Sequence, residues 1–178
     1  MLQLRDKTRD KGEVLATGRE LKSLCDTHGA LFIINDDADI ALACGAHGLH
    51  VGQADLPINE ARRVLTPHQL VGCSNNGINE SVNSQQQGAD YIAVGAVFPT
   101  TTMGRSGRTS VGAEMISQVK AVVSQPIVAI GGINADNIAQ VARAGADCIC
   151  VVSAVTHASA PEVAATELLA IIESAAPV

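Results

Sequence analysis

Two cationic residues near the start of the chain could bind a phosphorylated ligand. Arg5 and Lys7 stand two positions apart, and in an extended segment such residues point to the same side of the chain. Two cations directed into one pocket suit a pyrophosphate group, because they can make charge-assisted hydrogen bonds to several of its oxygens. The alternative is the solvated, charged end of a strand, which is the commoner interpretation of an isolated Arg-x-Lys pair.

Two aspartates that follow neighbouring apolar runs, Asp36 and Asp55, could hold a divalent cation. Mg²⁺ is bound in proteins through one or two carboxylates, keeps several waters and also contacts substrate phosphates. The pattern does not favour this hypothesis over its alternative, in which Asp55 caps the helix that follows Pro57. Asp37 and Asp39 are expected to face solvent or to begin a helix, since acidic residues stabilise a helix N-terminus.

Small and hydroxyl-bearing residues take the corresponding positions later in the chain. Gly132 and Ser153 follow the last two apolar runs, where the loops of many (β/α) barrels hold a phosphate through backbone N–H groups. Thr100 and Thr102 could donate hydroxyl hydrogen bonds to a phosphate, and the alternative is an ordinary polar loop. His50 lies inside an apolar run and is interpreted as a buried, hydrogen-bonded histidine. We find no nucleophile–base pair, so nothing in the sequence requires covalent catalysis.

All these candidates follow short apolar runs that alternate with stretches of helical spacing. The runs occupy residues 2–4, 30–34, 48–51, 70–73, 91–98, 127–130 and 148–152. A Gly-Ala-Asp or Gly-Ala-His triplet at residues 45–47, 88–90 and 145–147 ends a helical stretch and leads into a run. Strands alternating with helices predict a parallel α/β sheet of the TIM (β/α)₈ barrel type. Seven strands are visible, so the first β-strand and helix of such a barrel are missing, and in a closed barrel the candidates would ring one mouth.

Composition narrows the class of protein further. The chain has 178 residues, of which 47% are hydrophobic and 17% charged, and this predicts one globular domain over residues 1–178. A net charge of −6 argues against a general nucleic-acid or membrane-surface binder. Phosphorylated small molecules, the partners that the candidate residues indicate, would need local cations, backbone N–H groups or a metal. Five cysteines without a Cys-x-x-Cys pair indicate a reducing compartment. With no recognisable signal peptide or long apolar run, we expect a cytoplasmic protein. Formation of a homo-oligomer stays open.

Taken together, these segments resemble the thiamin-phosphate synthase family. The matching segments are QLRDK (3–7), IIND (33–36), GLHVGQADLP (48–57), GCS (72–74), GADYIAVGAVFPTTT (88–102), IVAIGGI (127–133) and VVSA (151–154). Each segment alone is a weak signal. They run in the family's order along nearly the whole chain, and this combination makes the resemblance specific.

The resemblance implies a role for each matched position. The residues that would bind the pyrimidine pyrophosphate are Gln3, Arg5, Lys7, Asn35 and Ser74. Those that would bind the thiazole phosphate, the last three largely through backbone groups, are Thr100, Thr102, Gly132, Val152 and Ser153. The residues that would hold Mg²⁺ are Asp36 and Asp55.

The resemblance also implies a reaction. Members of the family are transferases that couple the pyrimidine pyrophosphate to thiazole phosphate in thiamin biosynthesis, giving thiamin phosphate and pyrophosphate. Pyrophosphate leaves first, and the thiazole nitrogen then attacks the resulting pyrimidine-methyl cation. No side-chain nucleophile is expected. The enzyme would stabilise the leaving group electrostatically and position the reactants.

The chain departs from the family pattern in three places. Met103 stands where the family has a lysine that reaches the pyrophosphate, and Arg105 or Arg108 could replace that lysine. Asn76 stands where the family often has a histidine. The family's first strand and helix are absent. We expect the true start to lie upstream of Met1, the alternatives being a partner chain that fills the gap or a decayed protein.

Two rival functions remain at this point. One is a related barrel enzyme of the thiazole tautomerase type, which binds thiazole phosphate without coupling it. The other is a degenerate phosphate-binding barrel without activity, for which the missing strand and Met103 would speak. The retained cations and aspartates argue against both, because those residues would serve the pyrophosphate and the metal.

Overall fold

The computed structural model describes residues 1–101 and 109–175. The chain divides into two compact units. The first unit comprises Met1–Ser74 together with Gln86–Asp90, and the second comprises Asn75–Gln85 together with Tyr91–Val178. Among the described residues, no helix is both long enough and apolar enough to cross a bilayer.

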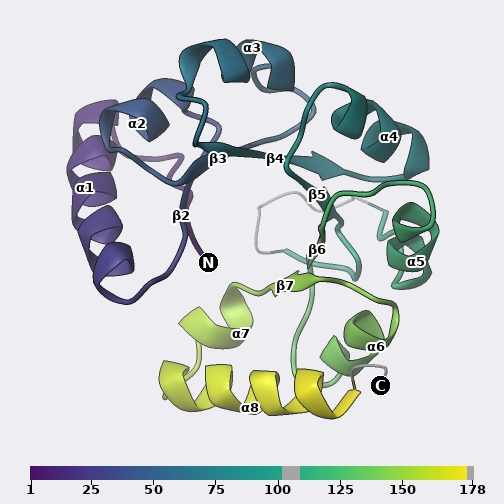
Figure 1. The fold of residues 1–178 in the computed structure, drawn as a ribbon. Coiled ribbons are helices and arrows are strands. Elements are labelled where there is room, and N and C mark those ends of the chain that lie inside the picture. The colour runs from purple at the N-terminus through teal and green to yellow at the C-terminus, as the bar shows by residue number, and fades with distance from the viewer. Residues whose placement is uncertain (102–108, 176–178) are drawn as a thin grey trace. The chain divides into compact units, whose positions relative to one another are not determined.

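The first unit is built from strands that alternate with helices. Its elements are β1 (Leu2–Leu4), α1 (Lys11–Thr27), β2 (Phe32–Asn35), α2 (Ala38–Ala43), β3 (Gly48–Val51), α3 (Ile58–Val64) and β4 (Leu70–Asn75). The strands are parallel and pair in the order β1-β2-β3-β4. Figure 1 shows the three helices on one side of these strands, as expected for successive βα units.

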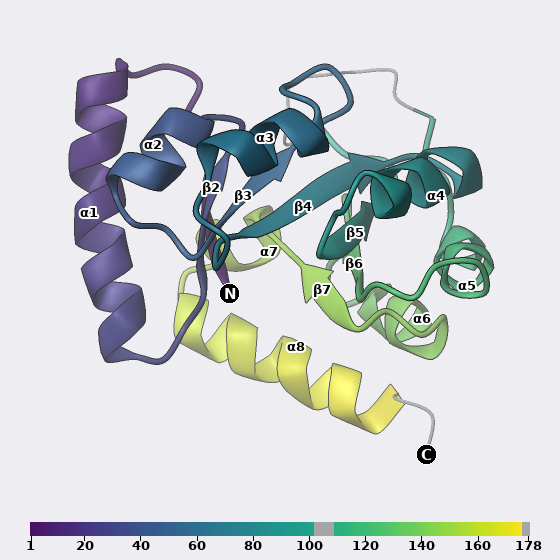
Figure 2. The same cartoon turned by 45° about the horizontal axis from the view of Figure 1, so that its top comes forward.

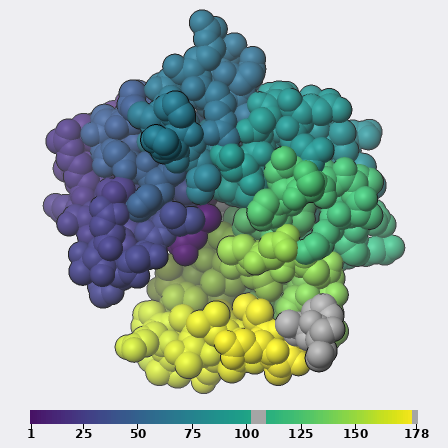
Figure 3. Space-filling view, viewed as in Figure 1, coloured from purple at the N-terminus to yellow at the C-terminus, as the bar shows by residue number. Residues whose placement is uncertain are grey.

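The second unit repeats this alternation. Its elements are α4 (Ile78–Gln86), β5 (Tyr91–Val94), α5 (Glu114–Lys120), β6 (Ile127–Ile130), α6 (Ile138–Arg143), β7 (Cys148–Cys150), α7 (Ser153–Thr156) and α8 (Pro161–Ala175). Strands β5, β6 and β7 are parallel and pair in that order. Helix α8 contacts α6 and α7 and lies at the molecular surface (Figures 2 and 3). Each of the seven predicted runs contains a strand, although the runs at 91–98 and 148–152 end as strands at Val94 and Cys150.

In the first unit, one sheet face is apolar and the other carries polar side chains beside apolar ones such as Ile33. Residues paired across parallel strands share a face, and the face alternates along each strand. Ile34 and Leu49 are paired on one face and are fully buried, and the Cδ1 of Ile34 approaches Gly18 of α1. Asn35 and His50 are paired on the opposite face. The helices therefore cover the apolar face, and the polar side chains lie on the other one.

The repeated Gly-Ala-Asp or Gly-Ala-His triplet is a strand clamp, by which we mean two hydrogen bonds between its third residue and the start of the preceding strand. In the first unit, Asp90 accepts the Val71 N–H through Oδ2 (2.7 Å) and donates its own N–H to the Val71 carbonyl (2.8 Å). In the second unit, Asp147 makes the same pair of bonds with Ile127 (2.8 and 2.9 Å). The triplet thus sets the register of each new strand, which explains its recurrence.

Histidine replaces aspartate in the first of these clamps. His47 accepts the Phe32 N–H through Nδ1 and donates its own N–H to the Phe32 carbonyl (both 2.9 Å). Its Nε2 lies 3.3 Å from a carboxyl oxygen of Asp26 on α1. An imidazole acceptor can serve here because the clamp needs only one lone pair directed at the strand N–H.

Candidate active site

A pair of carboxyl groups lies at the carboxyl ends of β2 and β3. Asp36 follows β2 directly, and its backbone has φ 63°, a left-handed conformation that is uncommon outside glycine, asparagine and aspartate. The Asp36 N–H donates to the His50 carbonyl (2.8 Å), which holds the turn in place. Residues held in such conformations cluster at functional sites, which makes this turn a candidate.

The electrostatic surroundings of Asp36 combine opposing influences. Burial raises the pKa of the Asp36 carboxyl, the Lys7 ammonium lowers it, and the neighbouring Asp55 carboxyl raises it again, with a raised pKa as the net result. Asp36 and Asp55 are close enough to share a hydrogen bond, and Lys7 forms an ion pair with Asp36. Two adjacent carboxylates would be stabilised by a cation placed between them.

The alternative role for Asp55, that of a helix cap, is wrong. Helix α3 begins after Pro57 without a side-chain cap, and Asp55 Oδ2 accepts the Gly52 N–H instead (2.9 Å). Asp37 and Asp39, by contrast with the carboxylate pair Asp36 and Asp55, form ion pairs with Lys11 (3.1 and 2.8 Å). The predicted distinction between the carboxylate pair and its two acidic neighbours is therefore present in the structure.

The carboxylate pair could hold a magnesium ion more readily than a metal whose ligands all come from protein side chains. Within residues 1–101 and 109–175, no group of three or more His, Cys, Asp or Glu side chains could hold a metal. Mg²⁺ needs only one or two carboxylates, because water and substrate phosphate complete its coordination shell. Asp36 and Asp55 fit that requirement.

The loop after β1 is not extended in the way that the expected alignment of Arg5 and Lys7 requires. Strand β1 ends at Leu4, so the strand alternation that would put Arg5 and Lys7 on one side does not extend to them. Asp6 organises the loop instead, accepting the Thr8 N–H and hydroxyl (both 2.8 Å) and the Arg9 N–H (3.1 Å). The Thr8 N–H and the Arg9 guanidinium hold the pKa of the Asp6 carboxyl well below its usual range. The sequence interpretation missed this role, which an Asp followed two positions later by Thr could have suggested.

The end of β3 contacts Ser74 of β4 at two points. His50 is 6% exposed, and its Nε2 lies 2.8 Å from the Ser74 hydroxyl. Gln53 donates its Nε2 hydrogen to the Ser74 carbonyl (2.7 Å). Burial lowers the pKa of His50 to about 4, against a smaller opposing effect of Asp55. The expectation of a buried, hydrogen-bonded histidine is confirmed. Gln3 is half-buried in the middle of β1, and Asn35 is half-buried at the end of β2.

In the second unit, closely packed glycines occupy the carboxyl ends of the strands. A Cβ on Gly95 would overlap the carbonyl oxygen of Ile130. A Cβ on Gly131 would stand 2.6 Å from the Cα of Ala96, and one on Gly132 would stand 2.6 Å from the Pro99 carbonyl oxygen. Gly131 and Gly132 also have positive φ values of 100° and 67°. Only glycine fits at these three positions. Gly95 is buried, whereas Gly131 and Gly132 are half-buried.

The remaining candidates of the second unit lie in loops or at a helix start. Thr100 is half-buried after β5, whereas Thr102 lies outside the described residues, as do Met103, Arg105 and Arg108. Val152 precedes α7, Ser153 is its first residue, and the Val152 carbonyl accepts the Thr156 N–H (2.9 Å).

One residue that sequence interpretation missed supports the glycine turn. Asn137 donates its Nδ2 hydrogen to the Gly132 carbonyl (2.9 Å), and its Oδ1 accepts the Asn134 N–H (2.9 Å). A single side chain therefore holds both ends of the turn that leads from Gly132 to Asn134.

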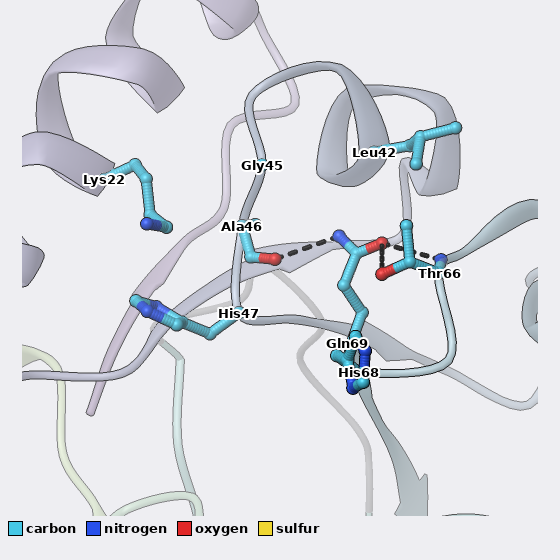
Figure 4. Close-up of a pocket in the computed structure, with 8 residues that line it drawn as sticks. All are labelled: Lys22, Leu42, Gly45, Ala46, His47, Thr66, His68 and Gln69. Atoms are coloured by element: carbon cyan, nitrogen blue, oxygen red, sulfur yellow. Dashed lines mark hydrogen bonds between the residues drawn. The ribbon is translucent and has the colours of Figure 1, made fainter.

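A separate cavity is lined by residues that precede β3 and β4 (Figure 4), whereas the carboxylate pair follows β2 and β3. Its volume is about 270 Å³, and its lining includes Lys22, His47, Thr66 and Gln69. Gln69 donates to the carbonyls of Ala41 and Ala46 (3.0 and 2.9 Å), and its Oε1 accepts the Thr66 N–H (3.0 Å). These bonds tie adjacent loops together, so the cavity wall is structural and the carboxylate pair remains the candidate active site.

Comparison with known proteins identifies the family of this chain. The family model described as thiamine monophosphate synthase matches residues 1–155. A thiamine-phosphate synthase of Chlorobium limicola is 42% identical over 97% of this chain and 82% of its own length. One of Shouchella clausii is 43% identical over 98% of this chain and 83% of its own length.

A solved structure extends the likeness to three dimensions. The thiamine phosphate pyrophosphorylase from Pyrococcus furiosus superposes with a TM-score of 0.89 at 36% identity, covering 97% of this chain and 82% of its own. The predicted fold class, a TIM-barrel-type α/β fold with seven visible strands, is confirmed. The tautomerase and degenerate-barrel alternatives are not favoured. This chain belongs to the thiamine monophosphate synthase family.

Proposed function

We propose that this chain, acting as a single domain over residues 1–178, couples a pyrimidine pyrophosphate to thiazole phosphate and releases thiamine phosphate and pyrophosphate. The observation that carries the proposal is the carboxylate pair beside Lys7, in a chain whose relatives are named thiamine-phosphate synthases. A pyrophosphate leaving group gains negative charge as its bond breaks, and cations with a metal-binding carboxylate pair suit that requirement.

In this proposal Asp36 and Asp55 hold Mg²⁺. The bound ion would supply charge neutralisation for the pyrophosphate. The support comes from the adjacency of the two carboxyls and from the raised pKa of Asp36, to which burial contributes most. Burial and the neighbouring Asp55 carboxyl both disfavour the charged form of Asp36, and a bound cation would offset that cost.

The pyrimidine pyrophosphate is assigned to the polar face and strand ends of the first unit. Lys7 pairs with Asp36 and Arg5 is exposed in the same loop, so both can turn to an anionic ligand. The uncharged residues assigned to this substrate are Gln3, Asn35 and Ser74. Their amides and hydroxyl can hydrogen bond to the pyrimidine ring or to phosphate oxygens.

The thiazole phosphate is assigned to the strand ends of the second unit. Gly132, Val152 and Ser153 would contribute mainly backbone N–H groups, which bind phosphate without a charged side chain. Thr100 and Thr102 would contribute hydroxyl groups. The support is that Gly132 is only half-buried and has no side chain to shield its own backbone.

The proposed reaction needs no side-chain nucleophile. The bond between the pyrimidine methylene carbon and the pyrophosphate oxygen breaks, and its electron pair leaves with pyrophosphate. The thiazole nitrogen then donates its lone pair to the methylene carbon and forms the new C–N bond. Lys7 and Arg5 stabilise the departing charge, and the binding groups hold the nitrogen in line with the carbon.

We further propose a cytoplasmic location and small phosphorylated partners. The five cysteines are free thiols, and Cys148 is exposed, which suits a reducing compartment. The net charge of −6 disfavours nucleic acid and anionic membranes. A homo-oligomer would be recognised by light scattering of the purified protein.

The test is direct synthesis. The purified chain is incubated with the pyrimidine pyrophosphate, thiazole phosphate and Mg²⁺, and thiamine phosphate and pyrophosphate are measured with and without chelator. We expect metal-dependent formation of both products in equal amounts. A folded sample that forms neither product, also after Met103→Lys, would exclude the proposed activity.

A further inference from the structure

We propose that His50 is a positioning residue that aligns the Ser74 hydroxyl with the pyrimidine pyrophosphate. This inference rests on the proposed function of Ser74. His50 Nε2 lies 2.8 Å from the Ser74 Oγ, and the histidine is almost completely buried. It does not need to touch the substrate, since it acts through the serine.

The strand register explains how the imidazole reaches the serine. His50 is paired with Gly72 across β3 and β4, and Ser74 lies two positions further along β4, on the same sheet face. Because Gly72 has no side chain, the ring can extend over it toward Ser74. Asn35 is paired with His50 on the other side, so three polar residues line this face in adjacent strands.

Ser74 is held at its backbone as well as at its hydroxyl. The Gln53 amide donates to the Ser74 carbonyl (2.7 Å), while His50 contacts the side chain. Gln53 follows β3 by two residues, so one strand and the loop after it fix both ends of a residue on the next strand. A serine that only filled space would not need its hydroxyl and its carbonyl held separately.

Hydrogen-bond directionality assigns the imidazole a specific proton. The almost complete burial of the ring favours its neutral form, in which one nitrogen carries hydrogen and the other accepts. A hydroxyl that donates its hydrogen to an anionic ligand must accept its other hydrogen bond. The tautomer with hydrogen on Nε2 would therefore donate to Ser74 Oγ and leave the serine hydrogen for the ligand.

Substrate-specific kinetics test the role. His50→Leu removes the hydrogen bond, whereas His50→Gln keeps a donor near the position of Nε2. We expect His50→Leu to lower kcat/KM for the pyrimidine pyrophosphate by ~10-fold or more and to leave KM for thiazole phosphate unchanged. His50→Gln should restore activity to within about threefold of the parent, a difference small compared with a full hydrogen bond. Equal loss in both variants would overturn the proposal.

A double-mutant cycle separates positioning from packing. In a Ser74→Ala background the hydroxyl is gone, so His50→Leu should have little further effect on kcat/KM. Effects that multiply independently would show that the histidine acts elsewhere. His28→Leu is the matched control, because His28 is an exposed histidine at the end of α1, and it should change neither kinetic constant.

A measurement without turnover keeps this inference apart from the proposed activity. The ¹⁵N shifts of the His50 ring report its tautomer, and Ser74→Ala should alter them in the absence of any substrate. Calorimetric titration with inorganic pyrophosphate and Mg²⁺ should show weaker binding to Ser74→Ala and to His50→Leu by similar factors. If the parent binds pyrophosphate but forms no product, the proposed function fails, while the ring shifts and the binding data still decide whether His50 positions Ser74.

Ring shifts that do not change in Ser74→Ala would overturn the positioning role of His50. If His50→Leu does not fold, His50→Asn replaces it, since its shorter amide cannot reach the Nε2 position.

Discussion

The two units present their strand ends in different ways. The first unit offers side chains, with Asp36, Asp55 and Lys7 meeting beyond the strands and His50 bonded to Ser74 on the sheet face. The second unit offers backbone, because Gly131 and Gly132 have positive φ and no room for a Cβ.

The two units also differ in the polarity of their sheet faces. In the second unit, Tyr91, Ala93 and Val128 form an apolar cluster against which Ile130 and Cys150 pack. The polar face of the first unit has Asn35 and His50 in adjacent strands. Under the proposed function, the first unit would bind its substrate through ionised groups and a metal and the second through backbone dipoles, so each unit should respond to a different kind of substitution.

The largest effect is expected from neutralising the carboxylate pair. Asp36→Asn keeps a residue type that tolerates φ 63° but removes the charge that would hold Mg²⁺. We expect activity to fall on the order of a thousandfold, with a thermal unfolding midpoint close to that of the parent. Asp39→Asn is the control, since Asp39 pairs with Lys11 and should retain activity. Equal rates for the parent and Asp36→Asn would remove the metal assignment.

A glycine substitution tests the backbone surface of the second unit. Gly132→Ala would add a Cβ 2.6 Å from the Pro99 carbonyl oxygen at φ 67°. We expect unfolding free energy to fall by roughly 4 kcal/mol from conformational strain and overlap together, and KM for thiazole phosphate to rise. Gly29→Ala is the matched control, because Gly29 has φ 62° and a Cβ placed there would have no atom within 4 Å. Its unfolding free energy should fall by only ~1 kcal/mol. Similar losses in denaturant titrations of the two variants would contradict a steric role for Gly132.

Acid should weaken the first unit through His50. Burial lowers the folded-state pKa of His50 to about 4 from 6.5, so the unfolded chain binds the proton more readily. The free energy of unfolding is therefore unaffected by this histidine above pH 6.5 and falls by about 3 kcal/mol in total as the pH is lowered toward 4. Urea titrations at several pH values should show this loss in the parent and a flatter profile in His50→Gln. A slope that is the same in both would contradict the assignment.

The smallest effect concerns the ion pairs that accompany the strand clamps in both units. Arg62 donates to the Gln69 and Gly88 carbonyls (2.8 and 2.9 Å) and pairs with Asp90. Lys120 donates to the Gly145 carbonyl and to Asp147 (both 2.7 Å). We expect Arg62→Met to lower unfolding free energy by roughly 2 kcal/mol and Lys120→Met by ~1 kcal/mol, because the lysine pair is more exposed and makes fewer bonds.

A matched arginine on the same helix controls for loss of charge. Arg63 pairs with Glu60 at 3.0 Å, and its side chain is 78% exposed. Arg63→Met should change stability by less than ~0.5 kcal/mol in the same denaturant titration. If it matched Arg62→Met, the carbonyl contacts of Arg62 would not be the source of the stabilisation.

Much of the fold could be predicted because its signals are local. Runs of branched aliphatic residues alternate with helical spacing, and the glycine of each triplet has the positive φ of a helix end, as Gly45, Gly88 and Gly145 show. Boundaries were harder to predict where the chain stays apolar after a strand ends. The run at 91–98 continues beyond Val94, since apolarity reports burial and burial continues through Val97. The short helix α7 was missed for a related reason, because four residues carry too little periodicity.

The candidate site was predictable in its residue types but not in its contacts. Asp36 and Asp55 could be selected as carboxylates that follow strands, yet the sequence left a cap and a metal ligand as equal interpretations of Asp55. The hydrogen bond to Gly52 decides against the cap. For Arg5 and Lys7, the end of β1 at Leu4 removed the alternation on which their expected geometry depended.

The sequence by itself determined the order of strands and helices, the family and the set of polar residues at the strand ends. Only the tertiary structure decided which of them meet. Lys7 reaches Asp36 across 29 positions, His50 reaches Ser74 across 24, and Gln53 reaches Ser74 across 21. The physical reason is that parallel pairing of strands separated by a helix brings together residues whose distance along the chain has no fixed period, whereas secondary structure follows from spacing within a few residues.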